Sequence, residues 1–204
     1  MLEYFEDGKI YETILVTSNN ATPVGVIKNG QTLFFKLFKG RSFVDITEFP
    51  FASIQITNDV ELLIKLALNI PVELRFYKFK KWRLIENLPG IYGRVEFNEK
   101  RWSDEFGESI ILECLLMPEG EVKGQLPLKP LSRADYALLE MAVYFTKIPP
   151  LIKMSNVEMI KNTYLKIRER YELYRHLGGK SELADFMMNK TGEYLSMLKE
   201  TTDT

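Results

Sequence analysis

The chain has 204 residues, of which 46% are hydrophobic and 27% are charged, and its 27 basic and 28 acidic residues give a formal net charge of −1. This length supports a core of normal size without disulfides or metals. The balanced charge argues against a general nucleic-acid binder, which needs a basic surplus, and no apolar run reaches the roughly 18 residues of a membrane-spanning helix.

The first half of the chain, up to about residue 126, has the pattern of short strands separated by turns. Asn29 and Gly30 lie between two apolar runs, which is a strong signal of a β-hairpin, and a type I′ turn would place both at positive φ. Residues 51–57 alternate between apolar and polar side chains, as a half-buried strand does. In all we expect strands at residues 10–18, 23–28, 31–38, 51–57, 72–79, 93–98 and 109–117, with turns at 88–90 and 118–120.

Helices are expected at one place in this half and throughout the rest of the chain. Asn58 and Glu61 form a capping-box pattern ahead of an apolar stretch that ends at Leu68. From about residue 131 the apolar spacing becomes helical, with steps of three and four residues. The helical signals are a cap at Ser132, a stop at Pro149-Pro150, an S-x-x-E box at Ser155–Glu158, an end at Gly178-Gly179 and a new start at Ser181. We therefore expect an α+β protein with a barrel or sandwich at residues 1–126 and a helical region at 131–200.

The segment Lys39-Gly40-Arg41-Ser42 is the best candidate for a binding site. It follows a predicted strand and combines two cations, a glycine and a hydroxyl. A phosphate group needs charge neutralisation, a close backbone approach and hydrogen-bond donors, all of which this segment offers. It lacks the spacing of a Walker A loop. A solvent-exposed surface loop would have the same composition.

Two further segments have a functional interpretation and a structural one. Pro23-Val24-Gly25 starts a strand, where glycine would let a flat ligand approach the backbone, although the start of an edge strand has the same sequence. Residues 75–83 interleave five cations with four aromatic residues, as a single-stranded nucleic-acid platform does. Charges that protect an exposed strand edge explain residues 75–83 equally well, so we expect no nucleic-acid partner.

The chain has one histidine, His176, and one cysteine, Cys114, so we expect no metal site and no disulfide. His176 lies near the end of a predicted helix and far in sequence from the other candidates, and Cys114 is expected to be buried among apolar residues. The tyrosines between residues 164 and 174 continue a helical apolar stripe and are expected to pack. An acidic beginning without a signal-peptide pattern leads us to expect a cytoplasmic location.

Taken together, several stretches resemble domain-of-unknown-function family 447, a mostly archaeal set of FMN-binding split-barrel proteins. The resemblance covers nearly the whole chain in the family's order. It rests on Tyr11–Ile14, Pro23–Val26, Leu37–Gly40, Ile56–Leu62, Arg133–Asp135 and Thr146–Ile148.

The resemblance implies a six-stranded antiparallel split β-barrel of Greek-key type followed by the helices, with FMN at the interface of a homodimer. Lys39, Gly40, Arg41 and Ser42 would then hold the phosphate. The backbone of Pro23, Val24, Gly25 and Val26, together with Gln55 and Thr57, would flank the isoalloxazine ring or the ribityl chain. The implied activity is that of an NAD(P)H:flavin oxidoreductase or a related redox protein, whose partner is a nicotinamide nucleotide or a small redox substrate; whether the chain is an enzyme stays open.

The chain also departs from the family pattern. The family tends to have asparagine where Gln55 stands, threonine where Ser42 stands, and a loop one residue longer beside Arg41. These departures motivate an alternative hypothesis, in which a flavin-free split-barrel dimer acts as a binding module or scaffold. Composition cannot separate the two hypotheses, because flavin chemistry belongs to the cofactor and needs no histidine or cysteine from the protein.

Overall fold

The computed structural model describes residues 1–104, 107–125 and 133–202. The described elements fall into two compact units, of which one is a β-barrel with two short helices and the other is helical. The boundary expected from the sequence, between residues 126 and 131, lies outside the described residues, as does the expected cap Ser132.

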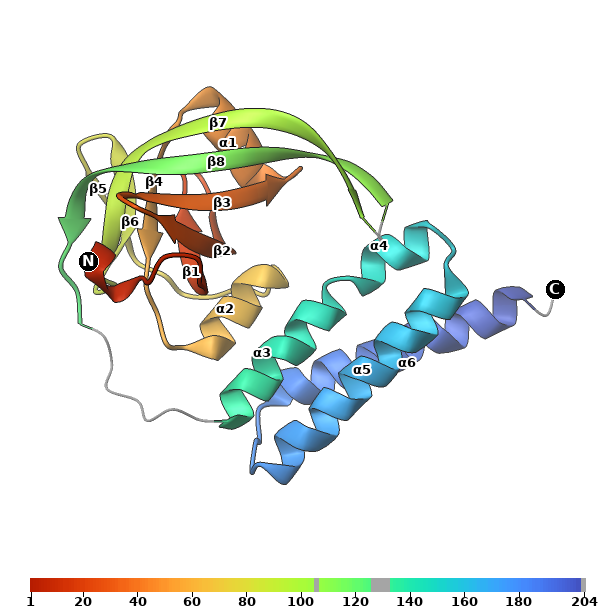
Figure 1. Ribbon diagram of the computed structural model, residues 1–204. Helices are drawn as coiled ribbons and strands as arrows, with labels where there is room; N and C mark the ends of the chain where they lie inside the picture. The colour runs from red at the N-terminus through yellow and green to blue at the C-terminus, as the bar shows by residue number, and fades with distance from the viewer. Residues whose placement is uncertain (105–106, 126–132, 203–204) are drawn as a thin grey trace. The chain divides into compact units, whose positions relative to one another are not determined.

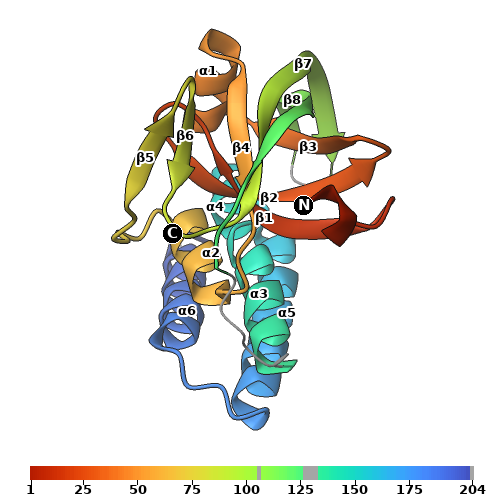
Figure 2. The ribbon, with the colours of Figure 1, turned by 90° about the vertical axis from the view of Figure 1, so that its left-hand side faces the viewer.

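Six antiparallel strands form a closed barrel (Figures 1 and 2). A short 3-10 helix, η1 (Leu2–Tyr4), precedes them. The barrel strands are β1 (Ile10–Val16), β2 (Ala21–Asn29), β3 (Thr32–Phe38), β4 (Phe51–Gln55), β7 (Gly90–Asp104) and β8 (Gly107–Val122). Their order around the barrel is β1-β2-β3-β8-β7-β4, and β4 closes the barrel on β1 through pairs such as Ile14 with Gln55. Because β4 returns beside β1 after three consecutive strands, the topology is a Greek key, as expected.

The barrel core is formed by inward-facing side chains from these strands, among them Leu15, Val26, Phe35 and Ile54, each at most 1% exposed. Cys114 on β8 belongs to the same core, which confirms that it is a buried hydrophobic residue. Burial raises the pKa of its thiol to about 12, so the thiol stays protonated and unreactive.

The hairpin predicted at Asn29-Gly30 is present, but its turn differs by one residue. Asn29 pairs with Thr32, which leaves Gly30 and Gln31 as the two central residues. Gly30 has a φ of +58°, whereas Asn29 does not lie in the left-handed region. A glycine at the first central position is typical of a type II′ turn, so the expected type I′ turn is wrong.

Two helices flank the barrel, α1 (Arg41–Glu48) on one side of the strands and α2 (Val60–Ala67) on the other (Figures 1 and 2). The sequence did not predict α1. The helix α2 was expected to be capped by Asn58, but Asp59 caps it by accepting a hydrogen bond from the backbone of Leu62 over 3.0 Å. The cap is therefore one residue later than expected.

Residues 76–85 form a separate two-stranded sheet of β5 (Phe76–Phe79) and β6 (Trp82–Ile85). The expected strand at 72–79 is shorter than predicted, and β6 was not predicted at all. The turn expected at residues 118–120 is also wrong, because these residues continue β8. At this point β7 and β8 approach each other so closely that only glycine fits at position 93, since a Cβ there would lie 2.0 Å from the carbonyl oxygen of Met117.

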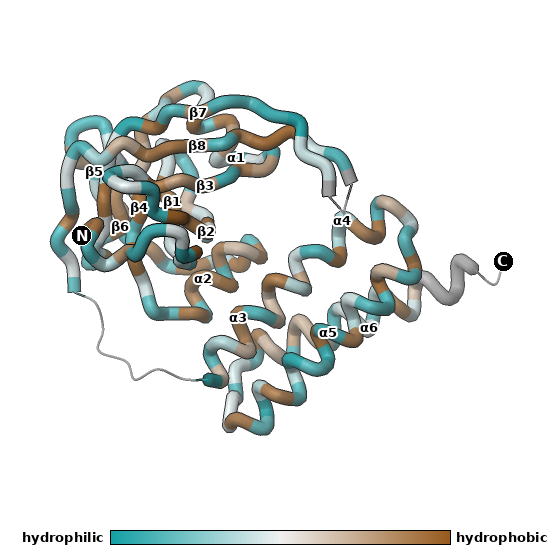
Figure 3. Tube along the Cα trace, viewed as in Figure 1, coloured by the Kyte–Doolittle hydropathy of each residue, from teal (hydrophilic) through white to brown (hydrophobic). Residues whose placement is uncertain are grey.

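The helical unit consists of α3 (Arg133–Phe145), α4 (Ile148–Lys153), α5 (Val157–His176) and α6 (Glu182–Thr202). Along α3 and α5 hydrophobic and hydrophilic stretches alternate (Figure 3), and α5 packs against the three other helices. Pro149-Pro150 follow the end of α3 as expected, but they lie in the first turn of α4, where proline is favoured. The cap of α5 is Asn156 and not Ser155, because Asn156 accepts from the backbone of Met159.

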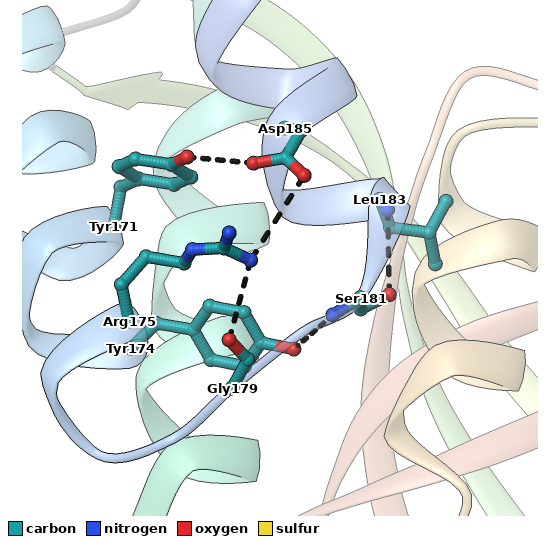
Figure 4. Close-up of polar contacts among 7 residues, drawn as sticks. All are labelled: Tyr171, Tyr174, Arg175, Gly179, Ser181, Leu183 and Asp185. Carbon is teal, nitrogen blue, oxygen red and sulfur yellow. Dashed lines mark hydrogen bonds and ion pairs between the residues drawn. The ribbon is translucent and has the colours of Figure 1, made fainter.

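Polar contacts fix the turn between α5 and α6 (Figure 4). The Tyr171 hydroxyl donates to Asp185 over 2.6 Å, which raises the pKa of that hydroxyl. The backbone N–H of Ser181 donates to the Tyr174 hydroxyl over 2.7 Å, and the Tyr174 ring packs directly on Gly179. His176 is the last residue of α5, as expected. No helix in the described part of the chain is long and apolar enough to cross a membrane.

Candidate functional site

The barrel wall opens between β2 and β3. These two strands pair only at their hairpin end, from Ile27 with Phe34 to Asn29 with Thr32. Beyond that point β2 stays paired with β1 as far as Ala21, and β3 stays paired with β8 as far as Phe38. The two edges therefore diverge, and backbone groups that a continuous sheet would pair face each other across a gap.

A cavity of about 780 Å³ occupies this opening. Its volume falls within the range of roughly 300–1,000 Å³ that is common for small-molecule sites. Residues from the turn before β2, the start of β2, the end of β3, the start of α1 and the end of α2 line it. They are Asn20–Val24, Lys36–Ser42, Leu66, Asn69 and Ile70.

The N-terminus of α1 opens into this cavity. Gly40 is its N-cap residue with extended backbone, and the first bond within the helix runs from the N–H of Val44 to the carbonyl of Gly40 over 3.2 Å. Among the described residues no side chain caps this end, and the first turn contains no acidic residue. Unpaired N–H groups and the helix dipole favour an anion at such an end. The exposed cations Lys39 and Arg41 stand on either side of Gly40 and reinforce this preference.

Hydrogen bonds fasten the turn between β1 and β2 to α1. The Asn20 side-chain amide donates to the Ser42 hydroxyl over 2.9 Å. Asp45, one helical turn further on, accepts from Thr17 and from the backbone and side chain of Asn19. Burial by itself would raise the pKa of the Asp45 carboxyl, but these hydrogen bonds outweigh it and hold the pKa below its usual value. The turn and the start of α1 are therefore held together on this side of the cavity.

The end of α2 forms the apolar wall of the cavity. Leu66 and Ile70 contribute aliphatic side chains, and α2 packs against β2. The helix stops because Asn69 adopts a φ of +53°, and the N–H of Ile70 then donates back to the carbonyl of Lys65 over 2.8 Å. One cavity thus combines a cationic end with an apolar wall.

Six of the ten residues predicted as cofactor-binding line this cavity together: Pro23, Val24, Lys39, Gly40, Arg41 and Ser42. The other four do not line it. Val26 is fully buried in the barrel core, and Gly25 packs against Ile10 and Glu12. The Thr57 hydroxyl accepts from the backbone of Asp59, just before α2.

Gln55 is fully buried, and its amide is engaged within the protein. Its Nε2 donates to the carbonyls of Ile85 and Leu88, over 3.0 and 2.7 Å, and its Oε1 accepts from the N–H of Ile85. The side chain joins β4 to the end of β6, so any part that it plays in the cavity is indirect.

Sequence reasoning missed several lining residues, notably Asn20, Lys36 and Asn69. The bond of Asn20 to Ser42 depends on the helix α1, which the sequence did not predict. Lys36 could have been found from strand alternation, since it lies between the core residues Phe35 and Leu37 and so faces the opposite side. Its Nζ lies 3.8 Å from the centre of the Trp102 ring.

The other candidates from the sequence lie elsewhere. In the aromatic and basic segment 75–83, Trp82 is buried and donates to the carbonyl of Gly93, so its ring does not form an open platform. Arg83 stacks on Phe76 in the same sheet. Within the described residues no group of three or more His, Cys, Asp or Glu side chains could hold a metal ion.

Comparison with known families decides the family of this barrel. The family model described as the N-terminal domain of a protein of unknown function, DUF447, matches residues 11–123, which is more than half of the chain. The chain belongs to the DUF447 family. The resemblance inferred from the sequence is thereby confirmed.

Solved structures support the fold. An FMN-bound DUF447 protein from Methanosarcina mazei is 19% identical and has a TM-score of 0.61, covering 95% of this chain and 99% of its own. The styrene monooxygenase flavin reductase of Pseudomonas putida S12 is 10% identical, with a TM-score of 0.40 over 59% of this chain and 94% of its own, which is too distant to support an argument. No curated protein matches the chain. The DUF447 neighbour confirms an α+β fold with a six-stranded split barrel and helices.

Proposed function

We propose that this DUF447 protein binds FMN in the cavity between β2 and β3, with the phosphate at the N-terminus of α1. The observation that supports this most is the uncapped start of α1, which opens into the cavity between the cations Lys39 and Arg41. A dianionic phosphate fits unpaired N–H groups and two cations better than any neutral group does. The FMN bound to the Methanosarcina mazei protein motivates the choice of this anion.

The residues present fit the cofactor. Ser42 accepts from Asn20, and a hydroxyl that accepts one bond can still donate its hydrogen to a phosphate oxygen. The divergent edges of β2 and β3 offer backbone groups to the polar rim of the flavin. Leu66 and Ile70 provide apolar contact for its ring. In this proposal Gly25, Val26, Gln55 and Thr57 act by shaping the strands around the site.

Bound FMN would supply hydride and electron transfer, so the protein need only bind, orient and shield it. In this proposal the protein is an oxidoreductase related to NAD(P)H:flavin reductases. It acts as a cytoplasmic homodimer, and its substrate is a nicotinamide nucleotide or a small redox molecule. The chain's own contributions are phosphate binding by Lys39, Gly40, Arg41 and Ser42 and ring contact beside Pro23 and Val24.

The visible spectrum of the freshly purified protein tests the proposal first, because bound flavin colours a protein yellow. The apo protein is then titrated with FMN and with riboflavin. We expect FMN to bind at least about tenfold more tightly, since charged hydrogen bonds to the phosphate are absent with riboflavin. A colourless protein with no binding at about 1 mM FMN would refute the proposal.

A flavin-free scaffold is the second candidate. The engagement of the Gln55 amide inside the protein favours it, because the family tends to have a different amide residue there. The FMN titration separates the two candidates. A homodimer in sedimentation analysis that binds neither flavin would support the scaffold.

A further inference from the structure

A second cavity, of about 290 Å³, lies at the β5–β6 sheet. Residues from the β1–β2 turn, the end of α1 and both strands of the sheet line it: Ser18, Phe49, Phe76, Tyr77, Lys78, Lys81 and Arg83. It has no lining residue in common with the cavity between β2 and β3. The β1–β2 turn separates the two, with Ser18 at one cavity and Asn20 at the other.

The charge of this second cavity is one-sided. Lys78, Lys81 and Arg83 line it, and none of its lining residues is acidic. Lys81 is partly neutralised by Glu119 at 3.5 Å. The carboxylate of Asp45 attracts Arg83 through space, but its oxygens already accept from Thr17 and Asn19.

Arg83 lacks a full set of partners. Its guanidinium lies 3.6 Å from the centre of the Phe76 ring, and its Nη1 is buried without a hydrogen-bond partner among the residues that the structure describes. Burial lowers the pKa of this guanidinium, which reflects the cost of removing the charge from water. A carboxylate in the cavity that Arg83 lines would offset this cost through its opposite charge.

Aromatic side chains form the rest of the wall. Phe49 and Phe76 lie on the same side of the cavity as the cations, Phe49 remains 37% exposed, and Tyr77 lines the cavity from the middle of β5. Aromatic walls favour a flat aromatic ligand through offset and edge contacts. The small volume excludes a whole dinucleotide and suits a single ring.

We propose that the cavity formed by Ser18, Phe49, Phe76, Tyr77, Lys78, Lys81 and Arg83 is a binding site for a small aromatic carboxylate. The carboxylate contacts Arg83 and Lys78, and the ring lies against Phe49. The site is independent of FMN, because the two cavities have separate lining residues. If the proposed flavin function fails its test, this proposal is therefore unaffected, and the reverse also holds.

Calorimetric titration of the full chain with benzoate, benzamide and acetate tests the proposal. These probes separate ring from charge, since benzamide keeps the ring and acetate keeps the carboxylate. We expect benzoate to bind at least about tenfold more tightly than either of the others. Equal affinity for all three, or no detectable binding of benzoate at about 10 mM, would overturn the proposal.

Variants locate the binding. We expect Arg83→Gln to weaken benzoate at least about tenfold and Lys78→Gln, which removes an exposed cation without cost to folding, about threefold. The matched control is Lys80→Gln, in the turn of the same sheet but outside the cavity, and it should leave the affinity unchanged. If Lys80→Gln had the same effect as Lys78→Gln, or if Lys39→Ala with Arg41→Ala abolished benzoate binding, the site would be elsewhere.

Discussion

The side-chain amide of Asn20 and the hydroxyl of Ser42 are 2.9 Å apart and join the β1–β2 turn to the first turn of α1. Ser42 is only 5% exposed, so removal of its partner leaves a buried hydroxyl without this hydrogen bond. The variant Asn20→Ala should lower the free energy of unfolding by about 1 kcal/mol, which is a fall of about 2–4 °C in Tm. Thermal unfolding followed by circular dichroism checks this value. The control Asn98→Ala, at an exposed position of β7, should change Tm by less than half as much.

The cations at the start of α1 are predicted to recognise phosphate. Lys39→Ala combined with Arg41→Ala should weaken FMN at least about tenfold while changing riboflavin affinity less than about twofold. Fluorescence titration with both flavins measures the difference. The control Arg94→Ala with Lys123→Ala changes the net charge by the same amount away from the cavity. Equal losses for both flavins in the first variant would show that these cations do not contact the phosphate.

The ionisation of Asp45 makes the free energy of unfolding depend on pH in the acid range. Its folded pKa lies below that of the unfolded chain, so the unfolded state binds the proton more readily. The stabilisation by Asp45 is complete at pH values well above its pKa in the unfolded chain, which is about 3.9. This stabilisation is lost as the pH falls from there toward the pKa of the folded state. Urea unfolding at a series of pH values should show this loss. Asp45→Asn should be less stable at pH 7 and show a weaker acid dependence, and an identical pH profile would contradict this assignment.

The buried side chain of Gln55 is predicted to stabilise the fold. Gln55→Leu leaves the N–H of Ile85 and the carbonyls of Ile85 and Leu88 without their partner. Because unpaired buried polar groups are costly, the free energy of unfolding should fall by roughly 2–4 kcal/mol. Denaturant unfolding checks it. Gln31→Leu, in the exposed β2–β3 turn, serves as control and should stay within about 0.5 kcal/mol of the parent protein.

Two glycines of the helical unit should respond in opposite directions to alanine. A Cβ on Gly179 would lie 2.2 Å from the Tyr174 ring, so Gly179→Ala should destabilise by about 1–3 kcal/mol. Gly192 lies within α6 and has open space around it, so Gly192→Ala should stabilise by up to about 1 kcal/mol. The same unfolding experiment measures both. Destabilisation by both variants would show that helix propensity does not determine the effect at Gly192.

Much of the barrel could be predicted from local signals. The strands around the Asn29-Gly30 hairpin and the alternation at 51–57 both depend on neighbouring residues, and both correspond to observed strands. The turn type could not be predicted, because Asn29-Gly30 and Gly30-Gln31 are both good turn pairs and the ladder register decides between them.

The helix α1 was missed because its sequence is weakly helical. Val44, Ile46 and Thr47 are β-branched, and a glycine stands where a capping side chain is expected. Packing of Ile46 into the core stabilises the helix, and this contact is not local in sequence. Lys39–Ser42 was therefore interpreted as a loop, whereas Arg41 and Ser42 begin a helix whose start opens into the cavity. The lining residues from α2 could not be predicted, because they reach the cavity only through the packing of α2 on β2.

Along Ala21–Val24, β2 pairs with β1 but not with β3, and this register leaves main-chain groups facing the opening. Main-chain carbonyls are the same in every residue, and substitutions in this stretch leave them in place. A fold held by main-chain pairing can persist while the side chains change, as in the Methanosarcina mazei protein of 19% identity. Substitutions in this stretch can thus change the side chains that line the opening, and with them the ligand that fits, while the main chain around it keeps its polar groups.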